Sequence, residues 1–300
     1  MATSPQLDEV IGIVKPWVAN AQTLGTIEAL RVAYEELALN FQLAADIKTE
    51  RVAIGELCAE WIAAPGVADD RVLLYLHGGG YIMGSMGSHR EIISRLSRAA
   101  GVRALGLEFR LAPENPFPAA VDDAVAAYRG LLSTGVSPKK IVIGGDSAGG
   151  GLTVATLVAL RDLGEPLPAA GVCISAWTDL TQTAESLATN AAADPFLQRE
   201  ALELMATMYL GEQDRRTPLA SPMYADLHGL PPLLLQVGSC EILLDDSTKL
   251  AGRAKAAGVE ATLEVWDDMI HVWPVFASIL PEGQQAIEHA GVFIREHFSA

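Results

Sequence analysis

The sequence predicts an α/β fold, with a mostly parallel central sheet flanked by helices, and three observations support it. From about Val72 onward, short apolar runs alternate with longer stretches of helical periodicity, an order typical of a parallel sheet covered by helices. Half of the 300 residues are hydrophobic and 19% are charged, which excludes a disordered chain. The length suits one large domain, with or without a smaller insertion.

The expected elements alternate along the chain. Six short apolar runs are expected to form strands: Val72–Leu76, Val102–Phe109, Ile141–Gly144, Gly171–Ile174, Leu233–Val237 and Thr262–Val265. Helices are expected to begin near Ser88, Ala119, Ser147 and Asp245, and a last helix is expected from about Pro274 to His297. As an edge strand, Thr262–Val265 could pair with a second copy of the chain in a homodimer.

Two segments do not fit this alternation. Residues 1–50 have the pattern of two amphipathic helices, and residues 185–229 are again helical and rich in Ala, Leu and Met. We expect residues 1–50 to form a helical cap segment and residues 51–300 the main domain, with 185–229 as a second cap insertion. Both segments could cover the carboxyl ends of the strands, where open α/β sheets bind ligands. The alternative is that they are extra helices that only thicken the fold.

Composition argues against several classes of partner. The 37 acidic and 21 basic residues give a net charge of −16, which repels nucleic-acid phosphates and anionic lipids. No segment runs 18 residues without a polar or charged break, and the start of the chain lacks the pattern of a secretory signal. The three cysteines are widely spaced and have no metal-ligand pattern, so we interpret them as reduced thiols. These features predict a cytoplasmic protein with no metal site.

A candidate nucleophile lies in the segment Gly145-Asp146-Ser147-Ala148-Gly149. This G-x-S-x-G pattern directly follows a short apolar strand and directly precedes a helical run, which is the context of a nucleophile elbow. There the serine hydroxyl is exposed at the start of a helix, whose N–H groups favour developing negative charge. Taken alone, the pattern also fits a glycine-rich turn that binds a phosphate.

A second motif favours catalysis. His77-Gly78-Gly79-Gly80 follows the strand Val72–Leu76, and a glycine run exposes backbone N–H groups that can stabilise an oxyanion. In esterases such a loop acts together with the N–H of the residue after the nucleophile, here Ala148. We expect His77 to hold the loop by hydrogen bonds and not to act as the base.

The order serine, acid, histidine that goes with this elbow restricts the other catalytic residues. Among the histidines after Ser147, His271 lies on a loop after the last expected strand, which makes it the expected base. Glu241 follows the strand Leu233–Val237 by a few residues and is the expected acid. Asp245 is the alternative acid, although Asp245 and Asp246 are better placed to cap the next helix.

At this point the chain resembles the bacterial hormone-sensitive-lipase-like esterases, or family IV, of the α/β-hydrolase fold. The resemblance rests on the two motifs above and on three further stretches: Arg110-Leu111-Ala112-Pro113-Glu114, Pro116-Phe117-Pro118-Ala119-Ala120 and Ser175-Ala176-Trp177-Thr178-Asp179-Leu180. It implies a serine carboxylesterase with an N-terminal helical cap and no cofactor. It also implies that Gly79, Gly80 and Ala148 form the oxyanion hole, with Gly78 shaping the loop.

The resemblance implies hydrolysis of short- to medium-chain carboxylic esters, including lactones and acetyl esters, as small-molecule substrates. Four large side chains flank the motifs and are candidates for the substrate pocket, although each could be ordinary core: Tyr81, Met83, Trp177 and Trp273. Two alternatives use the same fold. One is a non-catalytic receptor for a small ligand, and the other is an amidase or peptidase with the same triad.

Overall fold

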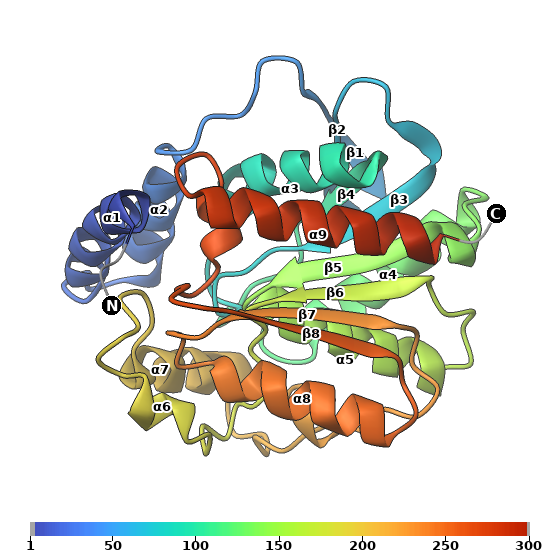
Figure 1. The fold of residues 1–300 in the computed structure, drawn as a ribbon. Helices are drawn as coiled ribbons and strands as arrows, with labels where there is room; N and C mark the ends of the chain where they lie inside the picture. The colour runs from blue at the N-terminus through green and yellow to red at the C-terminus, as the bar shows by residue number, and fades with distance from the viewer. Residues whose placement is uncertain (1–3, 299–300) are drawn as a thin grey trace.

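The computed structural model describes residues 4–298, and within them eight strands form one sheet (Figure 1). The strands are β1 (Lys48–Ile54), β2 (Leu57–Ala63), β3 (Ala68–Leu76), β4 (Val102–Leu107), β5 (Ile141–Asp146), β6 (Ala170–Ile174), β7 (Leu233–Gly238) and β8 (Ala261–Trp266). Their order across the sheet is β1-β2-β4-β3-β5-β6-β7-β8. Strands β3 to β8 are parallel, whereas β1 and β2 form an antiparallel hairpin that joins β4.

Helices cover both faces of the sheet (Figure 1). On one face lie α3 (Met86–Ala100) and α9 (Pro281–His297), and on the other lie α4 (Ala119–Ser133), α5 (Ala148–Asp162) and α8 (Leu244–Ala256). Successive residues of β3 enter different apolar cores, because Leu73 packs with the α3–α9 side and Leu74 with the α4–α5 side. A strand buried on both faces explains the continuous apolar runs in the sequence.

All six expected strands are present, and the β1–β2 hairpin is an addition that the sequence analysis missed. Most residues of β1 are exposed, so the strand lacks the apolar run on which the other six predictions were based. One helix boundary was wrong. The expected helix from Pro274 is a short 3-10 turn over Trp273–Phe276, and α9 begins only at Pro281, where the fixed φ of proline suits the first turn of a helix.

Further helices lie near the carboxyl ends of the parallel strands (Figure 1). They are α1 (Pro5–Ala21) and α2 (Ile27–Ala38) from the N-terminal segment, and α6 (Ser186–Thr189) and α7 (Arg199–Leu210) from the segment expected to be an insertion. The two segments contact each other, since the ring of Trp17 stacks on that of Phe196 with centroids 5.6 Å apart. Gln22 also donates a hydrogen bond to Gln198 at 2.7 Å. The cap expected from the sequence therefore has its two parts in contact.

None of the helices in residues 4–298 is both long and apolar enough to span a membrane. Strands β1 and β8 form the two edges of the sheet. Pairing of β8 with a second copy of the chain stays a prediction.

Candidate active site

The proposed nucleophile lies at the sharp turn between β5 and α5. Ser147 has φ 51° and ψ −120°, a left-handed region that is strained for a residue with a side chain. Its backbone N–H donates to the carbonyl oxygen of Ile174 at 2.8 Å, which ties the turn to β6. A Cβ on either Gly145 or Gly149 would collide with the carbonyl oxygen of Leu76. The two glycines of the motif thus allow the close approach of strand and helix.

Three side chains predicted from different parts of the sequence meet at this turn. The Nε2 atom of His271 lies 3.0 Å from Oγ of Ser147, and Nδ1 of His271 lies 2.9 Å from Oε2 of Glu241. His271 and Glu241 are 1% and 0% exposed, and Ser147 is 9% exposed. Because a carboxylate can only accept, Nδ1 carries the proton and Nε2 is left free to accept one from the serine.

Glu241 is held by two further donors. Its Oε1 atom accepts from Oγ of Ser175 and from the backbone N–H of Gly238, each at 2.6 Å. Burial raises the pKa of Glu241, whereas the bonds from His271, Ser175 and Gly238 act in the opposite direction. For His271, burial lowers the pKa, but the hydrogen bond and charge of Glu241 outweigh it and leave the pKa above the usual histidine value.

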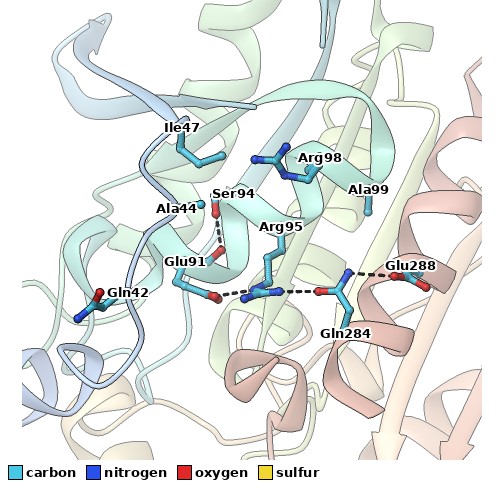
Figure 2. A pocket seen from close by; sticks show the side chains of 10 residues that line it. All are labelled: Gln42, Ala44, Ile47, Glu91, Ser94, Arg95, Arg98, Ala99, Gln284 and Glu288. Carbon is cyan, nitrogen blue, oxygen red and sulfur yellow. Dashed lines mark hydrogen bonds and ion pairs between the residues drawn. The ribbon is translucent and has the colours of Figure 1, made fainter. Parts of the chain in front are cut away.

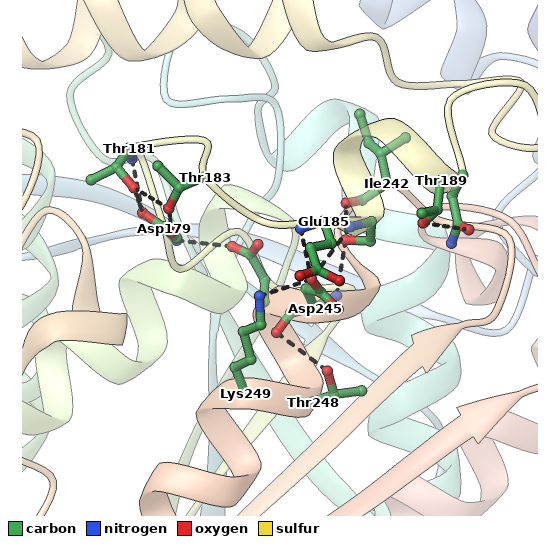
Figure 3. A network of polar contacts seen from close by, with 12 residues as sticks. Asp179, Thr181, Thr183, Glu185, Thr189, Ile242, Asp245, Thr248 and Lys249 are labelled. Carbon is green, nitrogen blue, oxygen red and sulfur yellow. Dashed lines mark hydrogen bonds and ion pairs between the residues drawn. The ribbon is translucent and has the colours of Figure 1, made fainter.

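The alternative acid, Asp245, is engaged elsewhere (Figure 3). Its Oδ2 atom accepts from the backbone N–H groups of Glu185 at 2.9 Å and Ser186 at 3.3 Å, and it pairs with Nζ of Lys249 at 2.8 Å. Asp245 therefore anchors the start of α6, and the hydrogen bond to His271 comes from Glu241.

The neighbouring Asp246 has a similar role. It is buried and accepts from the backbone N–H groups of Thr178 at 2.6 Å and Asp179 at 2.8 Å. Burial raises the pKa of Asp246 to about 7. Both acids lie in the first turn of α8, whose N-cap residue is Leu243. The expected position at the start of this helix is confirmed, but the carboxylates do not bond to its N–H groups, because the 178–186 segment presents N–H groups to them.

The glycine loop follows β3 and lies beside the nucleophile. Gly79 and Gly80 line the same cavity as Ser147, and both have positive φ, 111° and 63°. Within residues 4–298, no atom accepts a hydrogen bond from the backbone N–H of Gly79, Gly80 or Ala148. By contrast, the N–H of Gly78 donates to Oδ1 of Asp146 at 3.1 Å. Unpaired N–H groups at Gly79, Gly80 and Ala148 are available to a substrate oxygen.

His77 holds the loop, as expected. Its Nδ1 lies 2.7 Å from the carbonyl oxygen of Gly78, and its ring stacks on Phe109 with centroids 4.2 Å apart. Burial lowers the pKa of His77 to about 3. The ring is therefore neutral at physiological pH, and its Nδ1 donates to the loop.

A small cavity of about 30 Å³ lies at Ser147, a volume that holds roughly one or two water molecules. Of the four pocket candidates, Met83 and Trp177 line this cavity. Tyr81 does not line it and stacks on Tyr209 with centroids 3.8 Å apart. Trp273 lies in a separate apolar cluster with α1, and its indole donates to the carbonyl oxygen of Glu282.

Several further residues line this cavity that were not predicted from the sequence, most of them from the segments expected to form the cap: Tyr34, Phe196, Leu197, Leu202, Met205 and Val272. An outer apolar groove of about 570 Å³ extends from Trp17 and Leu30 to Leu204 and Met208, and it shares Met83, Phe196, Leu197 and Met205 with the inner cavity. These shared side chains separate the groove from Ser147.

A third hollow, of about 340 Å³, lies between α3, α9 and the segment before β1 (Figure 2). Most of its lining residues are polar or charged, and Arg95 spans it by donating to Glu91 of α3 and to Gln284 of α9. None of the expected catalytic residues lines it. Within the described part of the chain, no group of three or more His, Cys, Asp or Glu residues could hold a metal ion.

Comparisons with known proteins identify the fold and the family of the chain. A family model described as the α/β hydrolase fold matches residues 73–275. The chain is 50% identical to an acetyl-hydrolase of Streptomyces hygroscopicus over 90% of each chain. The crystal structure of an esterase from the bacterial hormone-sensitive lipase family superposes with a TM-score of 0.97, at 57% identity and full coverage of both chains. The esterase EstE5, soaked with p-nitrophenyl butyrate, superposes with a TM-score of 0.92 at 48% identity, over 99% of this chain and 100% of that chain.

The family model covers more than half of the sequence, and the matching proteins are similar along nearly their whole length. The chain belongs to the bacterial hormone-sensitive-lipase family of carboxylic ester hydrolases, within the α/β-hydrolase fold.

Proposed function

We propose that this esterase acts by two-step acyl transfer, with Ser147 as nucleophile, His271 as general base and Glu241 as the acid that orients the base. The observation that carries the proposal is the continuous chain of contacts from Ser147 Oγ to His271 Nε2 at 3.0 Å and from His271 Nδ1 to Glu241 at 2.9 Å. In the first step the serine hydroxyl attacks the ester carbonyl carbon while His271 takes its proton. His271 then protonates the leaving alcohol, and an acyl-enzyme remains.

In the second step His271 takes a proton from water, which attacks the acyl carbon. His271 then returns the proton to Oγ of Ser147 as the bond between Oγ and the acyl carbon breaks and the acid is released. In both steps the carbonyl oxygen becomes an oxyanion, which we place against the backbone N–H groups of Gly79, Gly80 and Ala148. Their lack of partners within residues 4–298 supports this role. Fixed donors in a site closed to water stabilise such a charge more than water does. Gly78 shapes the loop, because its own N–H is used by Asp146.

We further propose that the substrates are esters of short- to medium-chain acids. The cavity of about 30 Å³ at Ser147 leaves room for a small acyl group before the cap side chains must move. The relation to an acetyl-hydrolase and to an esterase studied with p-nitrophenyl butyrate supports the same range. The helices α1, α2 and α7 act as the cap over this site, since the outer groove is lined by residues between Trp17 and Leu30 and by α7.

The test is hydrolysis of p-nitrophenyl esters from acetyl to dodecanoyl by the wild type, Ser147→Ala, Glu241→Ala and Asp245→Ala, with circular dichroism to verify folding. Loss of turnover in Ser147→Ala and Glu241→Ala, with preference for short chains, supports the proposal. Loss in Asp245→Ala with an active Glu241→Ala would transfer the role of the acid to Asp245. Binding of small ligands without turnover of any ester would favour a receptor, and faster cleavage of a matched anilide would favour an amidase.

A further inference from the structure

Asp146, the residue just before the proposed nucleophile, has no part in the acyl-transfer steps above. It is 1% exposed, and its Oδ1 atom accepts from Oη of Tyr75 at 2.8 Å and from the backbone N–H of Gly78 at 3.1 Å. Its Oδ2 atom lies 3.5 Å from Nε2 of His89. One carboxylate therefore joins the nucleophile turn to β3, to the first glycine of the oxyanion loop and to α3.

The loop is packed directly on this carboxylate. A Cβ added to Gly78 would collide with Oδ2 of Asp146, so no side chain can stand between them. The N–H of Gly78 is turned toward Asp146, whereas Gly79 and Gly80 line the cavity at Ser147. The Gly78 contact therefore directly adjoins the two residues whose N–H groups have no partner within residues 4–298.

His89 is the ionisable side chain that faces Oδ2 of this buried carboxylate. Nδ1 of His89 lies 3.2 Å from the carbonyl oxygen of Ser85, which can only accept, so Nδ1 carries a proton. Nε2 faces Oδ2 of Asp146 at 3.5 Å and the N–H of Gly78 at 3.3 Å. Burial lowers the pKa of His89, but the charge of Asp146 outweighs it and raises the pKa above the usual value. Burial alone would raise the pKa of Asp146, yet His89 and Tyr75 hold it below its usual value. Asp146 is therefore an ionised acceptor at neutral pH.

We propose that Asp146 is a positioning residue for the oxyanion hole, which fixes the Gly79 and Gly80 N–H groups relative to Ser147 by holding the N–H of Gly78. The inference rests on the proposed function of the glycine loop. An oxyanion hole works because its donors are already in place when the charge develops. Displacing a catalytic group by about 1 Å lowers the rate roughly 100-fold. The substrate carbonyl interacts with these donors more weakly in the ground state than in the transition state. A displaced donor therefore lowers kcat and leaves KM nearly unchanged.

The test compares Asp146→Ala with Asp146→Asn. The alanine variant loses the nearer acceptor for the N–H of Gly78 and leaves only Nε2 of His89, at 3.3 Å. We expect its kcat for p-nitrophenyl acetate to fall by about 10- to 100-fold, with KM within about threefold. The asparagine side chain keeps a carbonyl oxygen for Gly78 and offers its N–H to Nε2 of His89. We expect it to restore kcat to within about fivefold of the wild type.

A trifluoromethyl ketone supplies a second measurement, because its hemiketal with Ser147 puts an oxyanion in the hole. We expect the inhibition constant of Asp146→Ala to rise by the same factor as its kcat falls. Tyr75→Phe is the control, since it removes a donor to the same carboxylate oxygen but leaves the Gly78 contact in place. If Asp146→Ala does not fold, Asp146→Glu moves the acceptor by one methylene group and is expected to lose kcat in the same way.

The inference is overturned if the alanine variant, or the glutamate variant in its place, keeps its kcat and inhibition constant. It is also overturned if Asp146→Asn loses as much as Asp146→Ala, because the hydrogen-bond acceptor would then not be what matters. The same experiment includes Ser147→Ala. An inactive wild type contradicts the proposed function itself. If the wild type is active, Ser147→Ala is inactive and the Asp146 variants are unchanged, only this inference is contradicted.

Discussion

The hydroxyl of Ser175 donates to Oε1 of Glu241 at 2.6 Å and accepts from the backbone N–H of Val272 at 3.0 Å. Val272 directly follows His271 in the chain. One buried hydroxyl thus holds both the proposed acid and the loop that carries the proposed base. Ser175 directly follows β6 and has φ 49°, so this connection is made in a strained backbone conformation.

Ser175→Ala is expected to lower kcat by about 3- to 10-fold and to reduce the free energy of unfolding by about 1–3 kcal/mol, because a buried carboxylate and a buried N–H each lose a partner. Steady-state kinetics and urea unfolding test both effects. Ser186→Ala is a matched control, since its buried hydroxyl donates to the carbonyl oxygen of Ile242 and accepts from the N–H of Asp245. The prediction fails if both variants change kcat equally.

Glu241→Gln is expected to lower kcat by about 10³- to 10⁴-fold. The amide removes the charge that stabilises the protonated His271, and it can favour the wrong tautomer of the imidazole. Asp245→Asn is the control, since its carboxylate holds Glu185, Ser186 and Lys249. We expect it to lower stability and to change kcat by less than about threefold. Equal losses of kcat in the two variants would contradict the assignment of the acid.

The catalytic motifs could be located from the sequence because each is local. A strand, a glycine-rich turn and a helix start lie within ten residues around Ser147, and the spacing from Glu241 to His271 follows from two neighbouring parallel strands, β7 and β8. The hairpin β1–β2 could not be found in this way. It is an edge element with mostly exposed residues in β1, so its stability comes from pairing with β4 and not from a local apolar pattern.

The walls of the cavity were missed for a related reason. Phe196, Leu197 and Met205 reach Ser147 only because the insertion folds back over the strand ends, and no periodicity in a helix identifies which of its apolar side chains faces a distant serine. Trp273 shows the converse error. It lies two residues from His271 in the chain, yet it packs with Leu7 and Val10 of α1, because sequence proximity does not fix the direction of a side chain.

The acid limb of the pH profile of kcat/KM is expected to reflect His271. The ring must be neutral to accept the serine proton, so activity is lost as the pH falls through its pKa. Burial lowers this pKa, but Glu241 outweighs burial and raises it above the usual histidine value of about 6.5, which puts the midpoint of the limb above that pH. Rates between about pH 5 and 9 test this. A midpoint well below the usual histidine value would contradict it, and His77, with a pKa of about 3, titrates outside this range.

Asp246 is expected to make stability fall as the pH rises toward neutrality. Its pKa is raised from 3.8 to about 7 in the folded protein by burial, so between these values the native state holds a proton that the unfolded state has lost. The free energy of unfolding then decreases with rising pH, by up to roughly 1.4 kcal/mol per unit. Asp246→Asn removes this contribution. Urea unfolding at several pH values should give the variant a less negative slope than the wild type, and equal slopes would contradict the prediction.

Met205→Ala is expected to shift the preference toward longer acyl chains. Met205 lines both the inner cavity and the outer groove, and its sulfur occupies the space that a Cβ on Gly80 would enter. Truncation joins the cavity of about 30 Å³ to the groove of about 570 Å³. We expect the ratio of kcat/KM for the octanoyl ester to that for the acetyl ester to rise at least about fivefold.

The same variant should lose about 2–5 kcal/mol of stability, because a buried side chain leaves a cavity. Leu204→Ala is the matched control on α7, since Leu204 lines only the outer groove and is 53% exposed. It should change neither the stability nor the chain-length ratio by much. An unchanged ratio in a folded Met205→Ala enzyme would show that the acyl chain does not pass this side chain. The chain length would then have to be limited by Trp177 or Leu202, which form other walls of the cavity.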